Sequence, residues 1–208
     1  MKFVEPKIQE TTPYNLLDAI KENYLNSMLF EHNINKEVTI SNQIIDSCIF
    51  KGIDFSNIKL DNIELVDVIF ENCDLSNQKL ESHLFERVKF INCKLYGVSF
   101  IDSSLKNILF ESCNAKFINF AGARLTNVLI NESDFSEMCF QETKIKNLEL
   151  NNVNLNKSEI TKTNLKDIDF SSCKIENLLM DTDSLKGLII DRFQAMYLIG
   201  MLGVKIKE

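Results

Sequence analysis

The 208-residue sequence predicts an all-β solenoid with four sides, closed at its C-terminal end by an α-helix. Two observations predict this fold. First, every fifth residue from Ile40 to Ile190 is apolar, without a slip over 31 positions, although only 45% of the chain is hydrophobic. Second, residue types recur every 20 residues, which is four such units. A period of five fits neither a helix nor a simple strand, so extended segments must alternate with regular corners.

Two further positions of each five-residue unit support this interpretation. Two residues before the apolar centre the side chain is small or apolar, as in Cys48 and Val68, so we expect it to point inward as well. The exceptions to a small or apolar residue at this position are polar: Gln43, Gln78, His83 and Asp183. Two residues after the centre Asn is frequent, and Asn favours corners because it tolerates left-handed dihedral angles.

Sorting the sequence at a period of 20 predicts ladders in the core. Stacked coils lie ~4.8 Å apart, so residues 20 apart become neighbours. About 7.7 coils between residues 37 and 190 make a rod of roughly 37 Å. The predicted core ladders are one of phenylalanines (Phe50, Phe70, Phe90, Phe110) and one of cysteines (Cys73, Cys93, Cys113).

These units resemble those of pentapeptide-repeat proteins. The segments ENCDL at 71–75, INCKL at 91–95 and KDIDF at 166–170 match the family pattern of a central Leu or Phe with a small residue two positions before it. The resemblance implies a right-handed quadrilateral β-helix in which four units make one coil.

The two ends depart from the repeat. We divide the chain into an N-terminal cap with an imperfect first coil (1–36), the β-helix (37–190) and a C-terminal helix and dimerisation segment (191–208). Thr12-Pro13 is expected to start a short helix, and Asp191 to cap the C-terminal one. That last helix carries more apolar residues than one face can bury, so we expect a homodimer, the alternative being a thick cap on a monomer. The predicted dimer residues are Phe193, Met196, Tyr197, Leu198, Met201 and Leu202.

The C-terminal segment FQAMYLIGMLGV at 193–204 resembles that of Qnr-type proteins, and the repeats at 91–115 are similar to loop-free Qnr-like proteins of Gram-positive chromosomes. The resemblance implies a non-enzymatic mimic of DNA that binds DNA gyrase or topoisomerase IV and protects it from quinolones. A generic scaffold with a non-topoisomerase target is the alternative.

The distribution of charge agrees with DNA mimicry. The net charge of −7 argues against direct binding of nucleic acid, and residues 37–190 hold 23 Asp and Glu against 16 Lys and Arg. We name each face after its apolar centre in the coil that contains residues 58–77. The Leu60, Phe70 and Leu75 faces are acidic, whereas the Leu65 face has 6 acidic and 7 basic residues. An ordinary solvated surface is the alternative. The candidate partner-binding residues are Asp54, Asp61, Glu71, Asp74, Glu81, Asp102 and Glu111.

Nothing in the sequence indicates an enzyme. His83 fills an inward position, no Cys and His spacing fits a metal site, and no motif fits a cofactor. Without an apolar run for a signal peptide or a membrane span, we expect a cytoplasmic protein with reduced thiols. One more row is notable, because it is apolar at an outward position of the Phe70 face: Ile49, Ile69, Leu109, Leu129 and Ile189.

Overall fold

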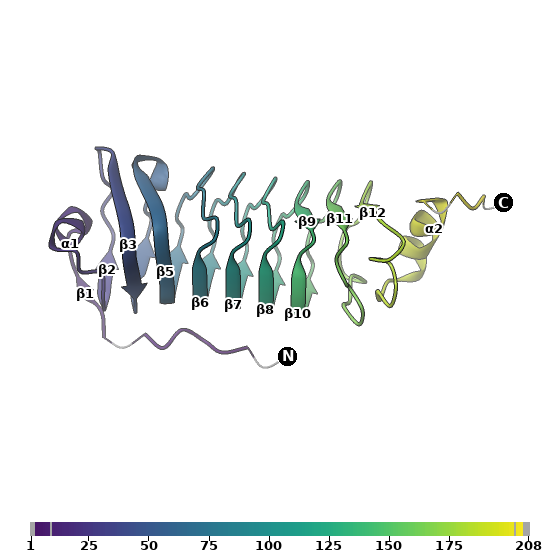
Figure 1. The fold of residues 1–208 in the computed structure, drawn as a ribbon, viewed down its shortest axis with the longest axis horizontal. Helices are drawn as coiled ribbons and strands as arrows, with labels where there is room; N and C mark the ends of the chain where they lie inside the picture. Colours follow the sequence, from purple (N-terminus) through teal and green to yellow (C-terminus); the bar gives the residue numbers. More distant parts are fainter. Residues whose placement is uncertain (1–2, 9, 202, 206–208) are drawn as a thin grey trace.

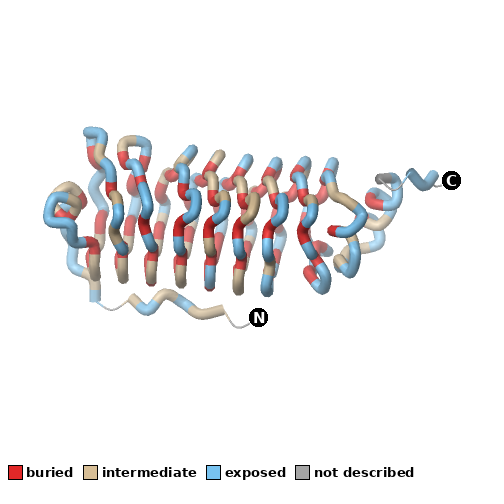
Figure 2. The backbone as a smooth tube through the Cα atoms, in the orientation of Figure 1, coloured by how far each residue is buried: buried red, intermediate tan, exposed pale blue. Residues whose placement is uncertain are grey.

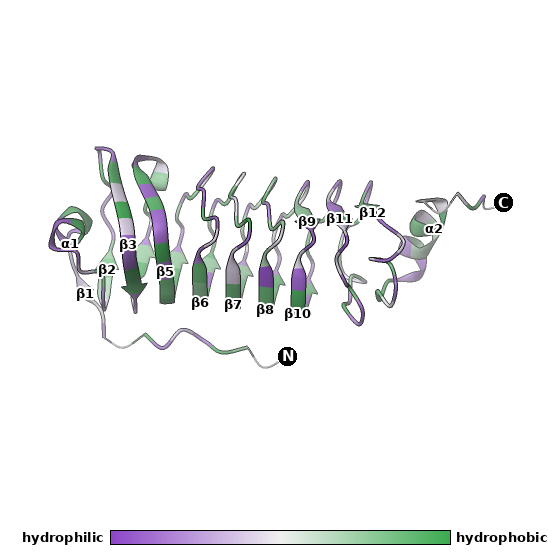
Figure 3. Cartoon of the chain, viewed as in Figure 1, coloured by the Kyte–Doolittle hydropathy of each residue, from purple (hydrophilic) through white to green (hydrophobic). Residues whose placement is uncertain are grey.

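The computed structural model describes residues 3–8, 10–201 and 203–205 of the chain. It is a straight rod of stacked coils with a short helix at each end (Figure 1). The predicted quadrilateral β-helix with a C-terminal helix is confirmed. Buried and exposed residues alternate along every coil (Figure 2), and the hydropathy of the strands alternates in the same way (Figure 3).

All strands pair in parallel, and from Met28 onward the register shift is 20 residues, so that Phe70 pairs with Phe90 and Phe90 with Phe110. This register establishes four five-residue units per coil. The larger sheet contains β1 (Thr12–Pro13), β2 (Met28–Phe30), β3 (Val38–Asp46), β4 (Ile49–Lys51), β5 (Ile58–Glu71), β6 (Leu84–Ile91), β7 (Ser104–Glu111), β8 (Arg124–Asn131) and β10 (Lys144–Asn151). The smaller sheet contains β9 (Cys139–Gln141), β11 (Glu159–Thr161) and β12 (Leu179–Met180).

The predicted core ladders are present. Phe50, Phe70, Phe90 and Phe110 are fully buried, and consecutive rings stack with centroids 5.1 Å apart. The thiols of the second ladder are buried and donate to main-chain carbonyls of the preceding coil, Cys93 Sγ to Phe70 O at 3.4 Å for example. The cysteine ladder is therefore a satisfied structural element, and all six cysteines are free thiols.

Left-handed backbone makes the corners. Asn62, Asn72 and Asn92 have φ between 47° and 54°, as the frequency of Asn predicted. The same conformation also occurs at residues that rarely adopt it, including Phe117 and Glu137. Asn57 departs from the prediction: the chain forms the 3₁₀ helix η1 (Phe55–Asn57) there instead.

The N-terminal helix begins later than predicted. Thr12 and Pro13 form β1, which pairs with β2, and helix α1 (Leu16–Glu22) is capped by Asn15, whose Oδ1 accepts from the Asp18 amide at 3.2 Å. The main-chain amides flanking Pro13 bond to the next coil, so the extended pairing wins over helix initiation.

Helix α2 (Arg192–Met201) closes the other end. Asp191 caps it as predicted, because its Oδ1 accepts from the Phe193 and Gln194 amides at 2.7 and 2.8 Å. Gln194 returns a bond from the Asp191 amide to its Oε1, and its Nε2 donates to Phe170 O and Cys173 O at 2.8 Å each. The helix is thus fastened to the last coil through two main-chain carbonyls of that coil.

Candidate partner-binding surfaces

The candidate acidic residues all lie on the outside of the rod. Asp54, Asp61, Glu81, Asp102 and Glu111 are exposed, while Glu71 and Asp74 are half-buried. The strand register and the isolated bridges place several of them in columns along the rod axis. The charges therefore form rows on a straight surface rather than one converging site.

Two of these columns can be followed coil by coil. Asp54 pairs directly with Asp74 in the next coil, and Lys94 follows Asp74 in the same column. Glu71 pairs with Ile91, which in turn pairs with Glu111, so these two carboxylates are separated by one apolar residue. Each column therefore carries carboxylates in two of these three coils, and a lysine or an isoleucine takes the remaining place.

Lysines neutralise part of this charge. Lys94 Nζ lies 3.3 Å from Asp74 Oδ2, and Lys59 Nζ lies 3.7 Å from Asp61 Oδ1, with both partners of the second pair more than half exposed. Burial tends to raise the pKa of Asp74, but hydrogen bonds from Ser76 and Lys94 outweigh it and leave the pKa lowered. Exposed ion pairs of this kind are weak, so a basic partner can compete for the carboxylates.

The C-terminal end presents an apolar surface, although not the whole predicted set. Phe193 is 61% exposed and Met196 51%, and Tyr197 is also exposed. Leu198 was wrongly assigned to the dimer interface: it is 5% exposed and belongs to the core of the protomer. The Met201 side chain and Leu202 lie outside the described residues. A shallow apolar groove of about 200 Å³ lies between the last coil and α2, and its lining is Leu185, Leu188, Ile190, Ala195, Leu198 and Ile199.

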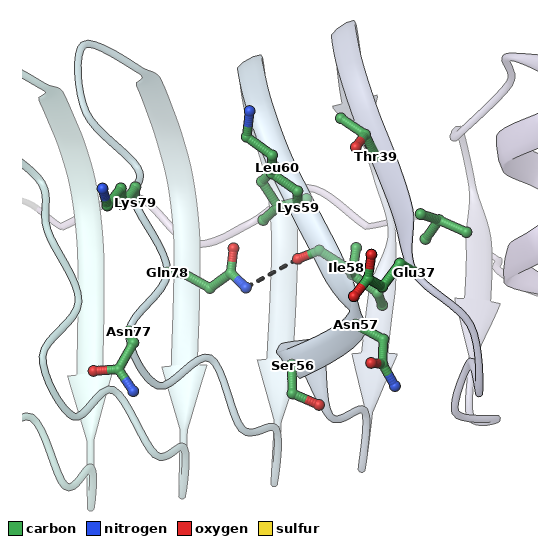
Figure 4. Close-up of a pocket in the computed structure, with 11 residues that line it drawn as sticks. Glu37, Thr39, Ser56, Asn57, Ile58, Lys59, Leu60, Asn77, Gln78 and Lys79 are labelled. Atoms are coloured by element: carbon green, nitrogen blue, oxygen red, sulfur yellow. Dashed lines mark hydrogen bonds between the residues drawn. The ribbon is translucent and has the colours of Figure 1, made fainter.

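A surface groove of about 600 Å³ lies on the Leu60 face (Figure 4). Its lining combines the apolar residues Val38, Ile58 and Leu60 with amide, hydroxyl, lysine and one glutamate side chains. The Gln78 side chain lines the groove beside η1 and donates to Phe55 O and Ile58 O, at 2.9 Å each. The polar Gln78 at an inward position thus supplies hydrogen bonds to two carbonyls at the corner that η1 forms.

Sequence reasoning missed an ion-pair cluster on the Leu65 face. Arg87 binds both carboxylate oxygens of Asp67 at 2.6 and 2.8 Å, and also Glu86 Oε1 at 2.6 Å. Lys106 bonds to Glu86 from the next coil at 3.0 Å. Asp67 and Arg87 are 20 residues apart, so opposite charges at that spacing were the available signal.

An exposed aromatic pair was also missed. Tyr96 and Phe117 are 43% and 42% exposed, and their rings meet edge to face with centroids 5.1 Å apart. Phe117 holds φ 59°, a conformation that a bulky residue adopts rarely. The pair projects from the corner between the Leu75 and Leu60 faces.

Other kinds of site find no support in the described part of the chain. Among those residues, no group of three His, Cys, Asp or Glu side chains could hold a metal ion. None of the helices described there is both long and apolar enough to cross a membrane.

Comparisons with known proteins agree with the repeat. A family model described as a pentapeptide repeat region matches residues 63–134. The sequence matches no curated protein. Among solved structures, the chain is similar to a trypsin-treated form of QnrB1, a plasmid-mediated fluoroquinolone resistance protein, with 17% identity over 88% of this chain and 89% of that one, at a TM-score of 0.43. It is also similar to HetL, a pentapeptide repeat protein involved in heterocyst differentiation regulation from the cyanobacterium Nostoc, with 14% identity over 89% and 92% of the two chains, at a TM-score of 0.34.

The period of five, the register of 20 and the family model lead to the same assignment. Residues 63–134 form a pentapeptide repeat region, and the same register of 20 residues continues in the coils on either side of it.

Proposed function

We propose that this protein is a non-enzymatic mimic of DNA that binds DNA gyrase or topoisomerase IV and protects the enzyme from quinolones. The observation that carries the proposal is the straight, uninterrupted rod with acidic residues on three contiguous faces. The Leu60, Phe70 and Leu75 faces adjoin one another, and five of the seven candidate carboxylates on them are exposed. The resemblance of residues 193–204 to the C-terminal segment of Qnr-type proteins points to a topoisomerase as the partner.

The magnitude of the charge limits how the mimicry works. A B-DNA segment of roughly 37 Å carries about 22 phosphate charges, at one per ~1.7 Å of axis. Residues 37–190 carry a net charge of −7, from 23 acidic and 16 basic residues. Shape and specific contacts must therefore supply most of the recognition, with charge steering the approach of a basic saddle.

A homodimer through α2 completes the proposal. Phe193, Met196 and Tyr197 share one exposed apolar surface at the end of the rod, beside the groove of Leu188 and Ile190. A second copy is the occupant that fits, because a two-fold axis at this end would bring the same patch against itself and double the length of the rod. The dimer residues form an end surface, so the acidic faces would stay accessible.

The test is a gyrase supercoiling and quinolone-cleavage assay with the purified full-length protein. We expect binding and reduced quinolone-dependent cleavage. A triple variant, Asp61→Asn, Glu81→Gln and Asp102→Asn, removes three exposed carboxylates from the Leu60 face and should weaken binding at least tenfold. The matched control makes the same charge change on the balanced Leu65 face, with Glu64→Gln, Asp167→Asn and Asp183→Asn, and should bind nearly as well as the natural protein.

The proposal fails if neither gyrase nor topoisomerase IV binds at high micromolar concentration. Recovery of a different protein partner under those conditions would support the generic scaffold instead. Equal losses from both triple variants would show that only total charge matters and that the acidic faces carry no specific contact.

The oligomeric state is tested separately by light scattering coupled to size-exclusion chromatography. The double variant Phe193→Ser and Met196→Ser should shift a dimer to a monomer. Leu84→Ser, at a 50% exposed leucine on the side of the rod, is the control and should leave the mass unchanged. A monomeric natural protein would contradict the dimer.

A further inference from the structure

The N-terminal arm, residues 3–8, lies alongside the rod rather than ending in solvent. It runs from the first coil back along the ends of the strands as an extended segment (Figure 1). Phe3, Val4, Pro6 and Ile8 are half-buried, although the arm belongs to no β-ladder. Something on the rod therefore covers these apolar side chains.

Two contacts fix where the arm lies. The Lys7 amide donates to Asp67 Oδ1 at 2.7 Å, and the Glu5 carboxylate forms an ion pair with Lys89. Lys89 stands in the outward row of the Phe70 face, one coil beyond Ile69 and one coil before Leu109. Moving from residue 7 to residue 5 thus advances the arm by about one coil, and an extended chain that continues in this direction leads from Glu5 towards the coil of Leu109.

The burial of the outward row follows the arm. Leu109 is only 6% exposed, although its side chain points away from the core, and Ile69 and Leu129 are half-buried. Apolar residues at outward positions beyond the arm are far more exposed, with Ile189 at 46% and Leu84, on the neighbouring face, at 50%. The Ile69, Lys89 and Leu109 positions therefore form a row of low exposure beside the arm, with one cationic residue in it, and Ile49 and Leu129 continue the row on either side.

We propose that this row is a binding site for an extended apolar peptide bearing a carboxylate, and that the N-terminal arm occupies it in cis. Lys89 recognises the carboxylate, as it does Glu5, and the apolar positions on either side take the flanking side chains. While the arm is bound, the central strip of the Phe70 face is closed to any other protein.

The character of the contacts makes the arm displaceable. The two anchors that fix it are one hydrogen bond to a side chain and one ion pair, and residues 3–8 make no ladder with any strand. A strand that belonged to the fold would gain main-chain hydrogen bonds along its length. The arm instead depends on apolar contact and on charge, both of which a competing peptide can reproduce.

The experiment uses the full-length chain and a fluorescent peptide of residues 1–10, with binding followed by fluorescence anisotropy. The double variant Phe3→Ser and Glu5→Lys weakens the arm without altering the rod. We expect the peptide to bind this variant at least tenfold more tightly than the natural chain, whose own arm competes. Glu10→Lys makes the same charge change two residues after the arm ends, and should behave as the natural chain does.

A third substitution locates the site. Leu109→Lys, added to the double variant, should abolish peptide binding, and circular dichroism verifies that each variant keeps its fold. The single variant Glu5→Lys serves as a second, milder release of the arm. The proposal is overturned if the peptide binds none of these chains, binds natural and double-variant chains equally, or is unaffected by Leu109→Lys. None of these readouts involves a topoisomerase, so the result is independent of the proposed function.

Discussion

Replacing Phe110 by Ala should destabilise the rod by about 4 kcal/mol. Phe110 is fully buried, and its ring lies 5.1 Å from that of Phe90 and 5.4 Å from that of Phe135, centroid to centroid. Buried Phe→Ala substitutions cost roughly 3–5 kcal/mol, and each aromatic pair adds ~0.5–1.5 kcal/mol to the loss of area. We expect the upper half of that range, because the cavity would interrupt a ladder that neighbouring coils share.

The assay is urea unfolding followed by far-ultraviolet circular dichroism, together with thermal melting. At roughly 2–4 °C per kcal/mol for a chain of this size, the melting temperature should fall by roughly 8–16 °C. Phe110→Ile is the control, because Ile130 fills the next position of the same ladder, and it should cost only about 1–1.5 kcal/mol. A loss below ~1.5 kcal/mol for the Ala variant, or equal losses for Ala and Ile, would refute the reasoning.

Three further predictions follow from the corners, the arm and the thiols. Glu137→Asn should raise the unfolding free energy by about 0.5 kcal/mol, because Glu137 holds φ 60° and Asn tolerates it better; Gly97→Ala should lower it by about 1–2 kcal/mol, since the new Cβ would meet Asn77 Oδ1 at 2.7 Å. If chemical unfolding shows that Glu137→Asn lowers the unfolding free energy, or that Gly97→Ala raises it, this explanation of the left-handed corners is wrong. The pKa of Asp67 is lowered, because hydrogen bonds from Arg87 and the Lys7 amide outweigh the raising effect of burial. Its contribution to stability is therefore complete above the unfolded pKa of about 3.9 and is lost as the pH falls through the folded value. Asp67→Asn should cost about 2 kcal/mol in urea unfolding at pH 7 and much less at pH 3, whereas equal costs at both values would show that the charge is unimportant. Finally, an aromatic disulfide reagent should modify one thiol quickly in the native protein, Cys139, which is half-buried while the other five are buried. Cys139→Ser should abolish the fast phase, and its persistence would mean that the rod opens.

The repeat was predictable because each coil imposes the same steric demand on the same position. Phe70, Phe90 and Cys93 fill the slots assigned to them, since only an apolar centre and a small neighbour fit inside a square coil. The register of 20 followed from side-chain type alone. The corners could equally be predicted from the frequent Asn residues, because few residues adopt a left-handed backbone conformation without an energetic cost.

The ends were less predictable, since no repeat constrains them. Thr12-Pro13 satisfies the local rules for starting a helix, yet pairing with β2 decides its conformation. Leu198 could not be separated from its exposed neighbours, because α2 is apolar on several faces and its orientation depends on the coil beneath it. The contacts of Glu5 and Lys7 join residues about 60 or more apart outside the repeat, and no periodicity reports them.

The bonds of Gln194 to the last coil have a consequence for assembly. Parallel strands stacked in register at ~4.8 Å are also the arrangement of an amyloid fibril, which grows because each end offers unpaired main-chain groups to the next chain. By donating its side-chain amide to Phe170 O and Cys173 O, Gln194 occupies main-chain acceptors at the end of the stack, where a further coil would have to pair. Helix α2 thus prevents further coils from adding to this end of the stack. The rod resembles a short fibril whose length is fixed within one polypeptide.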